Sequence, residues 1–157
     1  MYRKEDLERE ALEYISKLEE LLACEEFDFN VNPDRVPKKR GVYVIFNKRD
    51  EKSVYVGRTY KRDLYQRILY YHKKRGSQFR TVLGRLYNLQ SKEEMSKYIM
   101  ENCSFRFKVI EDPEDRVRLE HFATAILNPI LNVKLKTVLT LLRYSRLFCA
   151  SFPRHDG

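Results

Sequence analysis

Two tyrosines lie two residues from a glycine, in mirrored order, within neighbouring runs of β-branched residues. The first run, GVYVIFN, spans residues 41–47, and the second, SVYVGRT, spans residues 53–59. Because β-branched and aromatic residues favour strands and only a short polar segment separates the runs, the pattern predicts a β-hairpin. With its turn centred near Arg49, Tyr43 and Tyr55 are expected to pair directly, so that both phenols point to one face of the hairpin.

The rest of the chain predicts helices around this hairpin and one more strand. An apolar stripe over residues 7–22 predicts an amphipathic helix with an acidic outer face, and Pro33 and Pro37 mark a linker after it. Further helices are predicted over residues 63–75 and 78–89, from Ser91 onward and from Asp112 to about Leu127, with a strand over residues 104–111. This order indicates an α+β fold, with a small three-stranded, mainly antiparallel sheet flanked by helices.

Charge is distributed unevenly along the chain. The formal net charge is +8, yet residues 1–30 hold four Lys or Arg against ten Asp or Glu. Residues 58–75 hold seven Lys or Arg against one acid, Asp63, and four tyrosines are interleaved with them. A dense basic segment with aromatic neighbours is typical of a surface that binds a polyanion such as nucleic acid. A solvated, soluble surface is the simpler alternative.

The spacing of the cysteines and the lengths of the apolar segments indicate the cellular compartment of the protein. Cys24, Cys103 and Cys149 lie far apart with no Cys-x-x-Cys pair, which predicts reduced thiols in an intracellular, cytoplasmic protein. No apolar leader with a cleavage site is recognisable at the start, so secretion is not expected. The most apolar late stretch, residues 137–148, carries two arginines and is shorter than the ~20 residues of a membrane span.

Two polar residues interrupt apolar helix faces. Glu120 shares its side of the predicted last helix with Val117, Ala123 and Leu127. A lone buried carboxylate is costly, so Glu120 either forms an ion pair at an edge or faces a cleft and binds a cation. Arg67 borders an apolar stripe in the same way, and a salt bridge between Arg67 and Glu120 would satisfy both.

Taken together, these residues resemble the ordered motifs of the GIY-YIG nuclease family. GVY and YVG match the family's two half-motifs with valine in place of isoleucine, and the match spans residues 41–132. The residues that correspond to the family's functional positions, in the same order, are Tyr43, Tyr55, Arg67, Glu120 and Asn132. Where some members carry a histidine one turn after the arginine, this chain has Tyr71, and His72 follows it.

The resemblance implies a metal-dependent DNA endonuclease that hydrolyses a phosphodiester bond with one divalent cation, Mg²⁺ or Mn²⁺. Glu120 would bind the cation, because Mg²⁺ prefers carboxylate and water oxygens. Arg67 would stabilise the phosphorane, and Tyr43 would orient or activate the attacking water. Tyr55 would position these groups, and Asn132 would buttress the strand–helix junction through hydrogen bonds.

The resemblance also suggests which residues contact DNA. Gly41 and Gly57 lack side chains, so a phosphate backbone could approach the strands beside the phenols. Arg58 could also lower the pKa of Tyr43. The basic side chains and the histidine expected to follow neighbouring phosphates are Arg58, Lys61, Arg62, His72, Lys73, Lys74 and Arg75.

The expected organisation has three parts: an acidic helix and linker over residues 1–37, the nuclease-like domain over residues 38–136, and an extension of unknown role over residues 137–157. A stand-alone nuclease directed by DNA structure, as in DNA repair, is favoured because no specificity module is recognisable after the domain. A dimeric restriction-type enzyme, assembled through the N-terminal helix, is the variant. Two other classes stay open: a non-catalytic nucleic-acid-binding module that retains the fold, and an interaction protein in which these residues form a salt-bridged core.

Overall fold

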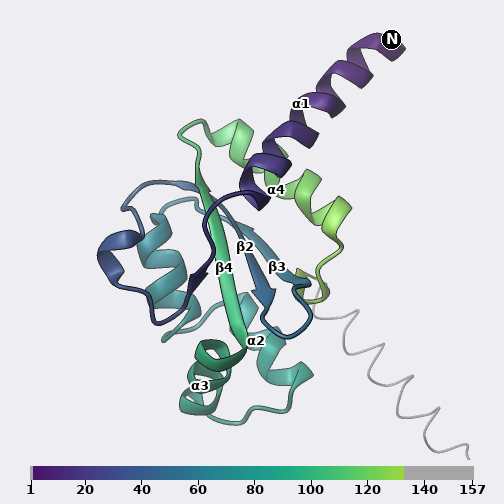
Figure 1. The fold of residues 1–157 in the computed structure, drawn as a ribbon. Helices are drawn as coiled ribbons and strands as arrows, with labels where there is room; N and C mark the ends of the chain where they lie inside the picture. The colour runs from purple at the N-terminus through teal and green to yellow at the C-terminus, as the bar shows by residue number, and fades with distance from the viewer. Residues whose placement is uncertain (1, 133–157) are drawn as a thin grey trace, which may run out of the picture.

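The computed structural model of the protein describes residues 2–132. Its sheet is antiparallel and has four strands in the order β1-β4-β2-β3 (Figure 1). The strands are β1 (Phe27–Asp28), β2 (Gly41–Asn47), β3 (Ser53–Arg58) and β4 (Cys103–Val109). The α+β class is confirmed, but the expectation of three strands is wrong. The additional strand, β1, has two residues and is therefore too short to show a periodicity in the sequence.

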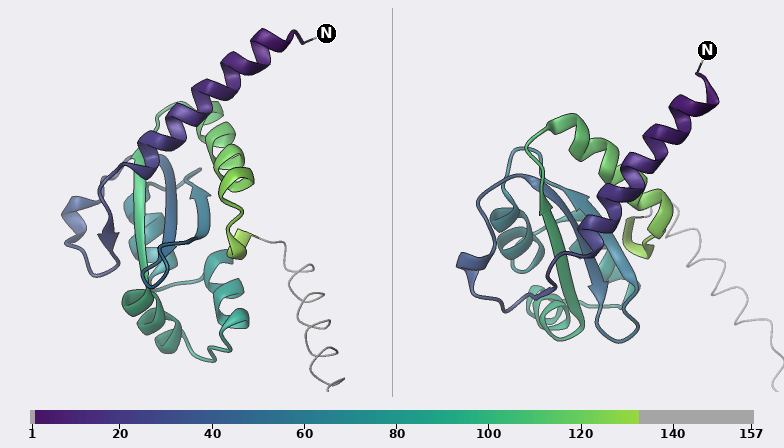
Figure 2. Two further views of the ribbon diagram at one scale, coloured as in Figure 1. Left: turned by 45° about the vertical axis from the view of Figure 1, so that its right-hand side comes forward. Right: turned by 45° about the horizontal axis from the view of Figure 1, so that its top comes forward.

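Helices cover both faces of the sheet. The α-helices are α1 (Lys4–Leu22), α2 (Gln78–Leu86), α3 (Lys92–Asn102) and α4 (Pro113–Leu127), and η2 (Gln66–His72) is a π-helix. Short 3₁₀ helices lie at η1 (Pro33–Arg35) and η3 (Ile130–Asn132). Figure 2 shows α1 and α4 along one side of the sheet. Residues of η2, α2 and α3 pack on the other side.

The central strand β2 divides the core into two layers. Val42 and Val44 pack with the buried residues of α1 and α4, whereas Tyr43 and Ile45 pack with those of η2, α2 and α3. This alternation is the period-2 pattern of a strand that is buried on both faces. Tyr43 is thereby directed toward the layer that contains η2.

The register of the β2–β3 hairpin differs from the expected one. Tyr43 is opposite Gly57, and Tyr55 is opposite Ile45, so the predicted direct pairing of Tyr43 with Tyr55 is wrong. The turn over residues 47–52 includes Glu51 with a φ of 55°, and the register shifts between Ile45 and Phe46. The displacement along the strand is two residues, and side chains repeat every two residues. Both phenols therefore still lie on the same face.

Helix α1 packs only through its C-terminal half. Tyr14, Leu18 and Leu21 are buried, whereas Leu7 and Leu12 are 54% and 64% exposed. Figure 2 shows the N-terminal part of α1 extending away from the sheet. The predicted apolar stripe is thus only partly covered in this structure.

The predicted helix ends are largely confirmed. Ser91 and Glu94 form the expected capping box of α3. Asp112 caps α4 with Pro113 in the first turn, and α4 ends at Asn128, which has a φ of 44°. Within residues 2–132, no helix is both long and apolar enough to cross a bilayer. The extension predicted over residues 137–157, with Cys149, lies outside the described residues.

Candidate active site

The helix that follows β3 has an unusually wide turn, and this decides where its polar residues point. The Asp63 carboxylate accepts a hydrogen bond from the Gln66 N–H at 2.7 Å and so caps this segment. At its end, the Lys73 N–H donates to the carbonyl of Ile68, five residues earlier, at 3.1 Å. In such a π-type turn the position one turn after Arg67 is residue 72. His72 therefore stands where an α-helix would have placed Tyr71.

Tyr43, His72 and Ser77 form a buried chain of polar contacts. The Tyr43 hydroxyl lies 2.5 Å from Nε2 of His72, and Nδ1 of His72 lies 2.9 Å from Oγ of Ser77. Burial lowers the pKa of His72 well below its ordinary value, and the charges of Arg67 and Arg80 add to this effect. His72 is therefore neutral near pH 7. Its predicted contact with DNA is wrong, because its side chain has no exposed surface.

Arg67 lies against the two phenols. Its Nε–H donates to the Tyr43 oxygen at 3.4 Å, and the rings of Tyr43 and Tyr55 are 6.3 Å apart between centroids. Burial raises the pKa of both phenols above the ordinary value, and the charge of Arg67 opposes the shift. The expectation that Arg58 lowers the pKa of Tyr43 is not met, because the phenol is fully buried and Arg58 is bound elsewhere.

Glu120 on α4 pairs with Arg58 at the end of β3. The Arg58 Nε–H donates to Oε2 of Glu120 at 2.6 Å, and the two side chains are 30% and 22% exposed. The ion pair foreseen for Glu120 is therefore present, but its partner is Arg58 and not Arg67. After burial, the charge of Glu120 is a smaller contribution that raises the pKa of Tyr43 and of Tyr55.

The donor set around Glu120 suits only a cation with few protein ligands. Across residues 2–132, no three His, Cys, Asp or Glu side chains come together as a metal site. Within the same residues, Oε1 of Glu120 makes no hydrogen bond, and Oε2 makes the single one to Arg58. Mg²⁺ keeps several waters and is often held by one or two carboxylates plus substrate phosphates. The residues present therefore fit Mg²⁺ or Mn²⁺ bound through Glu120, with water and phosphate as the remaining ligands.

Asn132 closes the outer edge of β3. Its Oδ1 accepts a hydrogen bond from the Val56 N–H at 2.7 Å, and its Nδ2 donates to the Val56 carbonyl at 2.8 Å. Because β3 is the edge strand, these backbone groups have no ladder partner on that side. The hydrogen bonds expected of Asn132 are present on the side of the strand. The contact is bidentate and involves the backbone alone.

The two motif glycines make room for protein atoms. A Cβ at Gly57 would overlap the Tyr43 hydroxyl and lie 2.5 Å from its Cζ, and a Cβ at Gly41 would overlap the Lys108 carbonyl. Both glycines are buried. The expectation that they stay bare so that a phosphate can approach is therefore not met. Gly57 is required because Tyr43 crosses directly over it.

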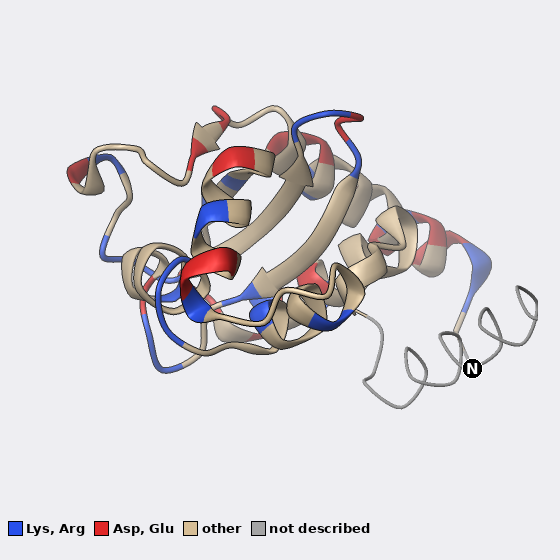
Figure 3. Ribbon diagram, turned by 90° about the horizontal axis from the view of Figure 1, so that it is seen from below, with Lys and Arg blue, Asp and Glu red and all other residues tan. Residues whose placement is uncertain are grey.

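The remaining predicted DNA contacts lie on the outside of the domain. Lys61, Arg62, Lys74 and Arg75 are exposed and Lys73 is half-buried. None of these five forms an ion pair with any residue between 2 and 132. Figure 3 shows Lys and Arg, in blue, along the loops beside the sheet. These positions leave the cations available to a polyanion.

Two residues that support this cluster were missed by sequence reasoning. Arg80 is 2% exposed and donates to the carbonyls of His72, at 3.2 Å, and of Lys73. It also donates to the Lys92 carbonyl at 2.7 Å, which ties the end of η2 to the start of α3. Ser77 caps α2 and contacts His72. The capping position of Ser77 was a visible signal in the sequence. Nothing in the periodicity marks Arg80 as buried.

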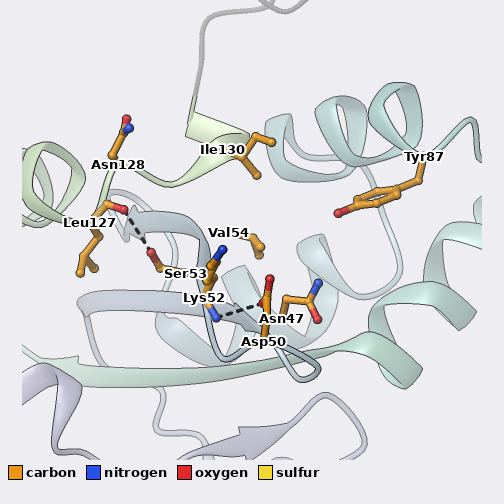
Figure 4. Close-up of a pocket in the computed structure, with 9 residues that line it drawn as sticks. All are labelled: Asn47, Asp50, Lys52, Ser53, Val54, Tyr87, Leu127, Asn128 and Ile130. Carbon is orange, nitrogen blue, oxygen red and sulfur yellow. Dashed lines mark hydrogen bonds between the residues drawn. The ribbon is translucent and has the colours of Figure 1, made fainter.

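A separate pocket of about 390 Å³ lies at the other end of the hairpin (Figure 4). It is lined by Asn47, Asp50, Lys52, Ser53, Val54, Tyr87, Leu127, Asn128 and Ile130. The predicted catalytic side chains are not part of its lining, so we regard it as distinct from the Tyr43 cluster.

Comparison with known proteins gives similarity at the level of structure only. No family model and no curated protein matches the sequence. Among solved structures, the chain is similar to the magnesium-bound GIY-YIG N-terminal endonuclease domain of UvrC from Thermotoga maritima. The sequence identity is 20% and the TM-score is 0.38, and the match covers 62% of this chain and 88% of that domain. A tyrosine-to-phenylalanine mutant of the same domain, also cation-bound, is similar at 18% identity, a TM-score of 0.38 and the same coverage. These matches are to the family that the sequence motifs resemble.

Proposed function

We propose that this protein is a DNA endonuclease that hydrolyses phosphodiester bonds with a single divalent cation. The observation that carries the proposal is the convergence of four side chains from separate elements. Tyr43 and Tyr55 lie on one face of the hairpin, and Arg67 from η2 donates to the Tyr43 oxygen at 3.4 Å. Glu120 from α4 pairs with Arg58 at the end of β3, the strand that carries Tyr55. A guanidinium, two hydroxyls and a lone carboxylate are the groups that phosphoryl transfer with one metal requires.

Arg67 is the group suited to bind the scissile phosphate. Its guanidinium is permanently charged and can donate to two phosphate oxygens at once. Within residues 2–132 its side chain has no carboxylate partner, and the hydrogen bond that its guanidinium makes is the long one to Tyr43. A phosphate can therefore replace that contact at little cost. Because Tyr43 has no exposed surface, Arg67 must turn toward the phosphate before Tyr43 can meet the attacking water.

Tyr43 and His72 can move a proton between them. Burial raises the pKa of Tyr43, so its hydroxyl stays protonated and is a poor base on its own. The neighbouring Nε2 of neutral His72, at 2.5 Å, can accept that proton while the Tyr43 oxygen takes one from water. Water thus becomes the attacking hydroxide, the phenol stays neutral, and the proton and its positive charge end on His72. Burial, Arg67 and Arg80 disfavour that charged form, so the imidazolium would return its proton readily once the reaction is complete.

Glu120 would hold the divalent cation. When bound, such a cation stabilises the leaving oxygen as a Lewis acid. Arg58 pairs with Glu120 in this structure and keeps the carboxylate in place at the end of β3. The residual exposure of both side chains leaves the carboxylate accessible to solvent.

Two finer features belong to the same proposal. We favour a stand-alone enzyme that recognises DNA structure, as in repair, over a sequence-specific one. In the dimeric restriction-type variant, the exposed Leu7, Leu12 and Ile15 of α1 would contact a second copy. A non-catalytic DNA-binding module is the second candidate, and the full burial of Tyr43 together with the Arg58–Glu120 pair favours it.

A plasmid assay separates these functions. Supercoiled DNA is incubated with the protein and Mg²⁺, with EDTA and with Glu120→Gln, while binding is measured in parallel by gel shift. The proposal expects nicked or linear product only with Mg²⁺ and the unchanged protein, with DNA binding retained in all three cases. Binding without product under any metal condition would establish the non-catalytic module instead.

A further inference from the structure

Two arginines and two tyrosines stack in sequence on the outer side of η2. The Arg62 guanidinium lies 3.8 Å from the centroid of the Tyr71 ring, and the Arg75 guanidinium lies 5.1 Å from that of Tyr70. The two rings meet edge to face, with centroids 5.3 Å apart and an angle of 83° between planes. We call Arg62, Tyr71, Tyr70 and Arg75 the Arg–Tyr ladder.

The ladder is open to solvent. Tyr70 is 40% exposed, Arg62 and Arg75 are exposed, and Tyr71 is half-buried. Large aromatic rings at such positions are not required by the core, whose layer on this side is filled by the inward-facing Ile68 and Leu69. Planar groups of this kind offer flat faces to a ligand.

The cations of the ladder differ in their partners from three cations on the α1 side of the sheet. On the α1 side of the sheet, Lys17, Arg106 and Lys108 each pair with a carboxylate. Over the described part of the chain, Arg62 and Arg75 pair with no carboxylate and meet aromatic rings instead. The ladder therefore keeps its positive charge while presenting planar groups.

The ladder also lies beside the candidate active site. Tyr71 follows Arg67 by four residues, which in the wide turn of η2 is almost one full turn. Arg67 and His72 are directed inward to Tyr43 from that same turn. If Arg67 binds a phosphate of a DNA strand, the bases nearest to that phosphate would thus lie next to the ladder.

We propose that the Arg–Tyr ladder stacks unpaired nucleobases next to the scissile phosphate, so that the preferred substrate is DNA with a single-stranded segment, such as a flap. This inference rests on the proposed nuclease function. In a continuous duplex the base faces are already stacked on one another, and only backbone and groove edges are available. Unpaired bases expose both faces, which stack on aromatic side chains and guanidinium planes. Point charges alone would suffice for duplex backbone binding, and the aromatic planes would then add nothing.

The test compares binding in EDTA, where cleavage does not interfere. A fluorescent duplex and the same duplex with a single-stranded flap are titrated with the unchanged protein, with Tyr70→Leu and with Tyr60→Leu. Tyr60 is the matched control, since it is 69% exposed and no ring or cation from residues 2–132 stacks on it. Arg75→Lys keeps the charge of the ladder and removes one plane.

We expect Tyr70→Leu to weaken flap binding about tenfold, with less than a twofold effect on duplex binding. Arg75→Lys should weaken flap binding in the same direction, and Tyr60→Leu should change neither affinity. A 2-aminopurine in the flap should be quenched on binding by the unchanged protein and less so by Tyr70→Leu. Equal losses on duplex and flap, or no loss with Tyr70→Leu, would overturn the ladder as a base-stacking site.

Failure of the nuclease proposal can be told apart from failure of the ladder. If flap binding depends on Tyr70 but no substrate is cut with Mg²⁺, the stacking site stands and the catalytic proposal fails. If duplex and flap are cut at equal rates by the unchanged protein and by Tyr70→Leu, the enzyme stands and the ladder is refuted. Melting temperatures of the variants, measured first, confirm that each one folds.

Discussion

The hydroxyl of Tyr43 lies 2.5 Å from Nε2 of His72, a residue 29 positions further along the chain. Both side chains are fully buried, and Arg67 and Arg80 place two positive charges near the imidazole. This arrangement keeps His72 neutral and aimed at the phenol. Loss of the phenol oxygen should therefore affect chemistry far more than the fold.

Replacing Tyr43 with Phe should lower the cleavage rate by about 10²- to 10⁴-fold, the usual contribution of a positioned acid–base group. The free energy of unfolding should fall by about 1–3 kcal/mol, because the contacts with His72 and Arg67 are lost and the buried Nε2 of His72 is left without a partner. Single-turnover cleavage and urea denaturation measure the two effects. Tyr60→Phe, at an exposed ring, is the control and should match the unchanged protein. Full activity in Tyr43→Phe would exclude Tyr43 from the reaction.

Stability should depend on pH through His72. Its pKa is lowered in the folded state, so the unfolded chain binds the proton more readily. Its contribution is therefore fully present above a pH of about 6.5, the unfolded pKa, and is lost as the pH falls below that value. Urea denaturation between pH 7.5 and 5 should show this decline, and His72→Gln should reduce it. An unchanged slope in His72→Gln would assign the decline to other groups.

Gly57→Ala should disrupt the site, because the new Cβ would overlap the Tyr43 hydroxyl. Overpacking of this kind costs about 1–3 kcal/mol of folding free energy, and displacement of Tyr43 should abolish cleavage. Gly76→Ala is the matched control, since a Cβ there has no atom within 4 Å. Thermal denaturation and plasmid cleavage of the two variants give the comparison. Similar behaviour of both variants would mean that Tyr43 can move aside freely.

Changes at Glu120 and Arg58 should move metal affinity in opposite directions. Glu120→Gln removes the carboxylate. It should abolish Mg²⁺-dependent cleavage, and Mn²⁺ should no longer give heat of binding when it is titrated into this variant. Arg58→Gln removes the cation that now donates to Glu120 at 2.6 Å, so Mn²⁺ should bind a few-fold more tightly. Titration calorimetry in the absence of DNA measures both. Weaker Mn²⁺ binding by Arg58→Gln would place the metal away from Glu120.

Arg80→Met should raise the pKa of His72, because the charge of Arg80 contributes to lowering it. It should also cost several kcal/mol of stability, since four hydrogen bonds from this guanidinium are lost. The His72 imidazole resonances, followed by NMR against pH, report the first effect independently of cleavage. Arg80→Lys, which retains the charge, should leave that pKa closer to its original value.

The sequence patterns predicted the hairpin and the helix caps because each depends on local chemistry. Asp112 with Pro113, and Ser91 with Glu94, are signals that act within one turn of a helix. The same reasoning predicted that Tyr43 and Tyr55 share a face, since that depends only on strand alternation. It gave the wrong register because it centred the turn near Arg49 without the left-handed residue Glu51 and the register shift beside Phe46.

The missed features depend on tertiary packing. Arg80 is buried because backbone carbonyls from two other segments surround it, and no spacing within its own helix encodes that. The partner of Glu120 is Arg58, which follows the motif glycine in the sequence and reaches α4 only through the fold. The strand β1 forms because Phe27 is opposite Phe105 on β4. Its two residues leave no pattern to read.

The wide winding of Gln66–His72 also bears on how chains of this kind can be compared. In a regular α-helix, one inserted residue rotates everything after it by about 100°. Here the wide turn accommodates a spacing of five residues between Arg67 and His72, so the imidazole of His72 reaches the phenol of Tyr43. Removing any one residue from this turn would tighten it and swing that imidazole away. A spacing of five residues between this arginine and this histidine therefore serves where an α-helix would require a spacing of four.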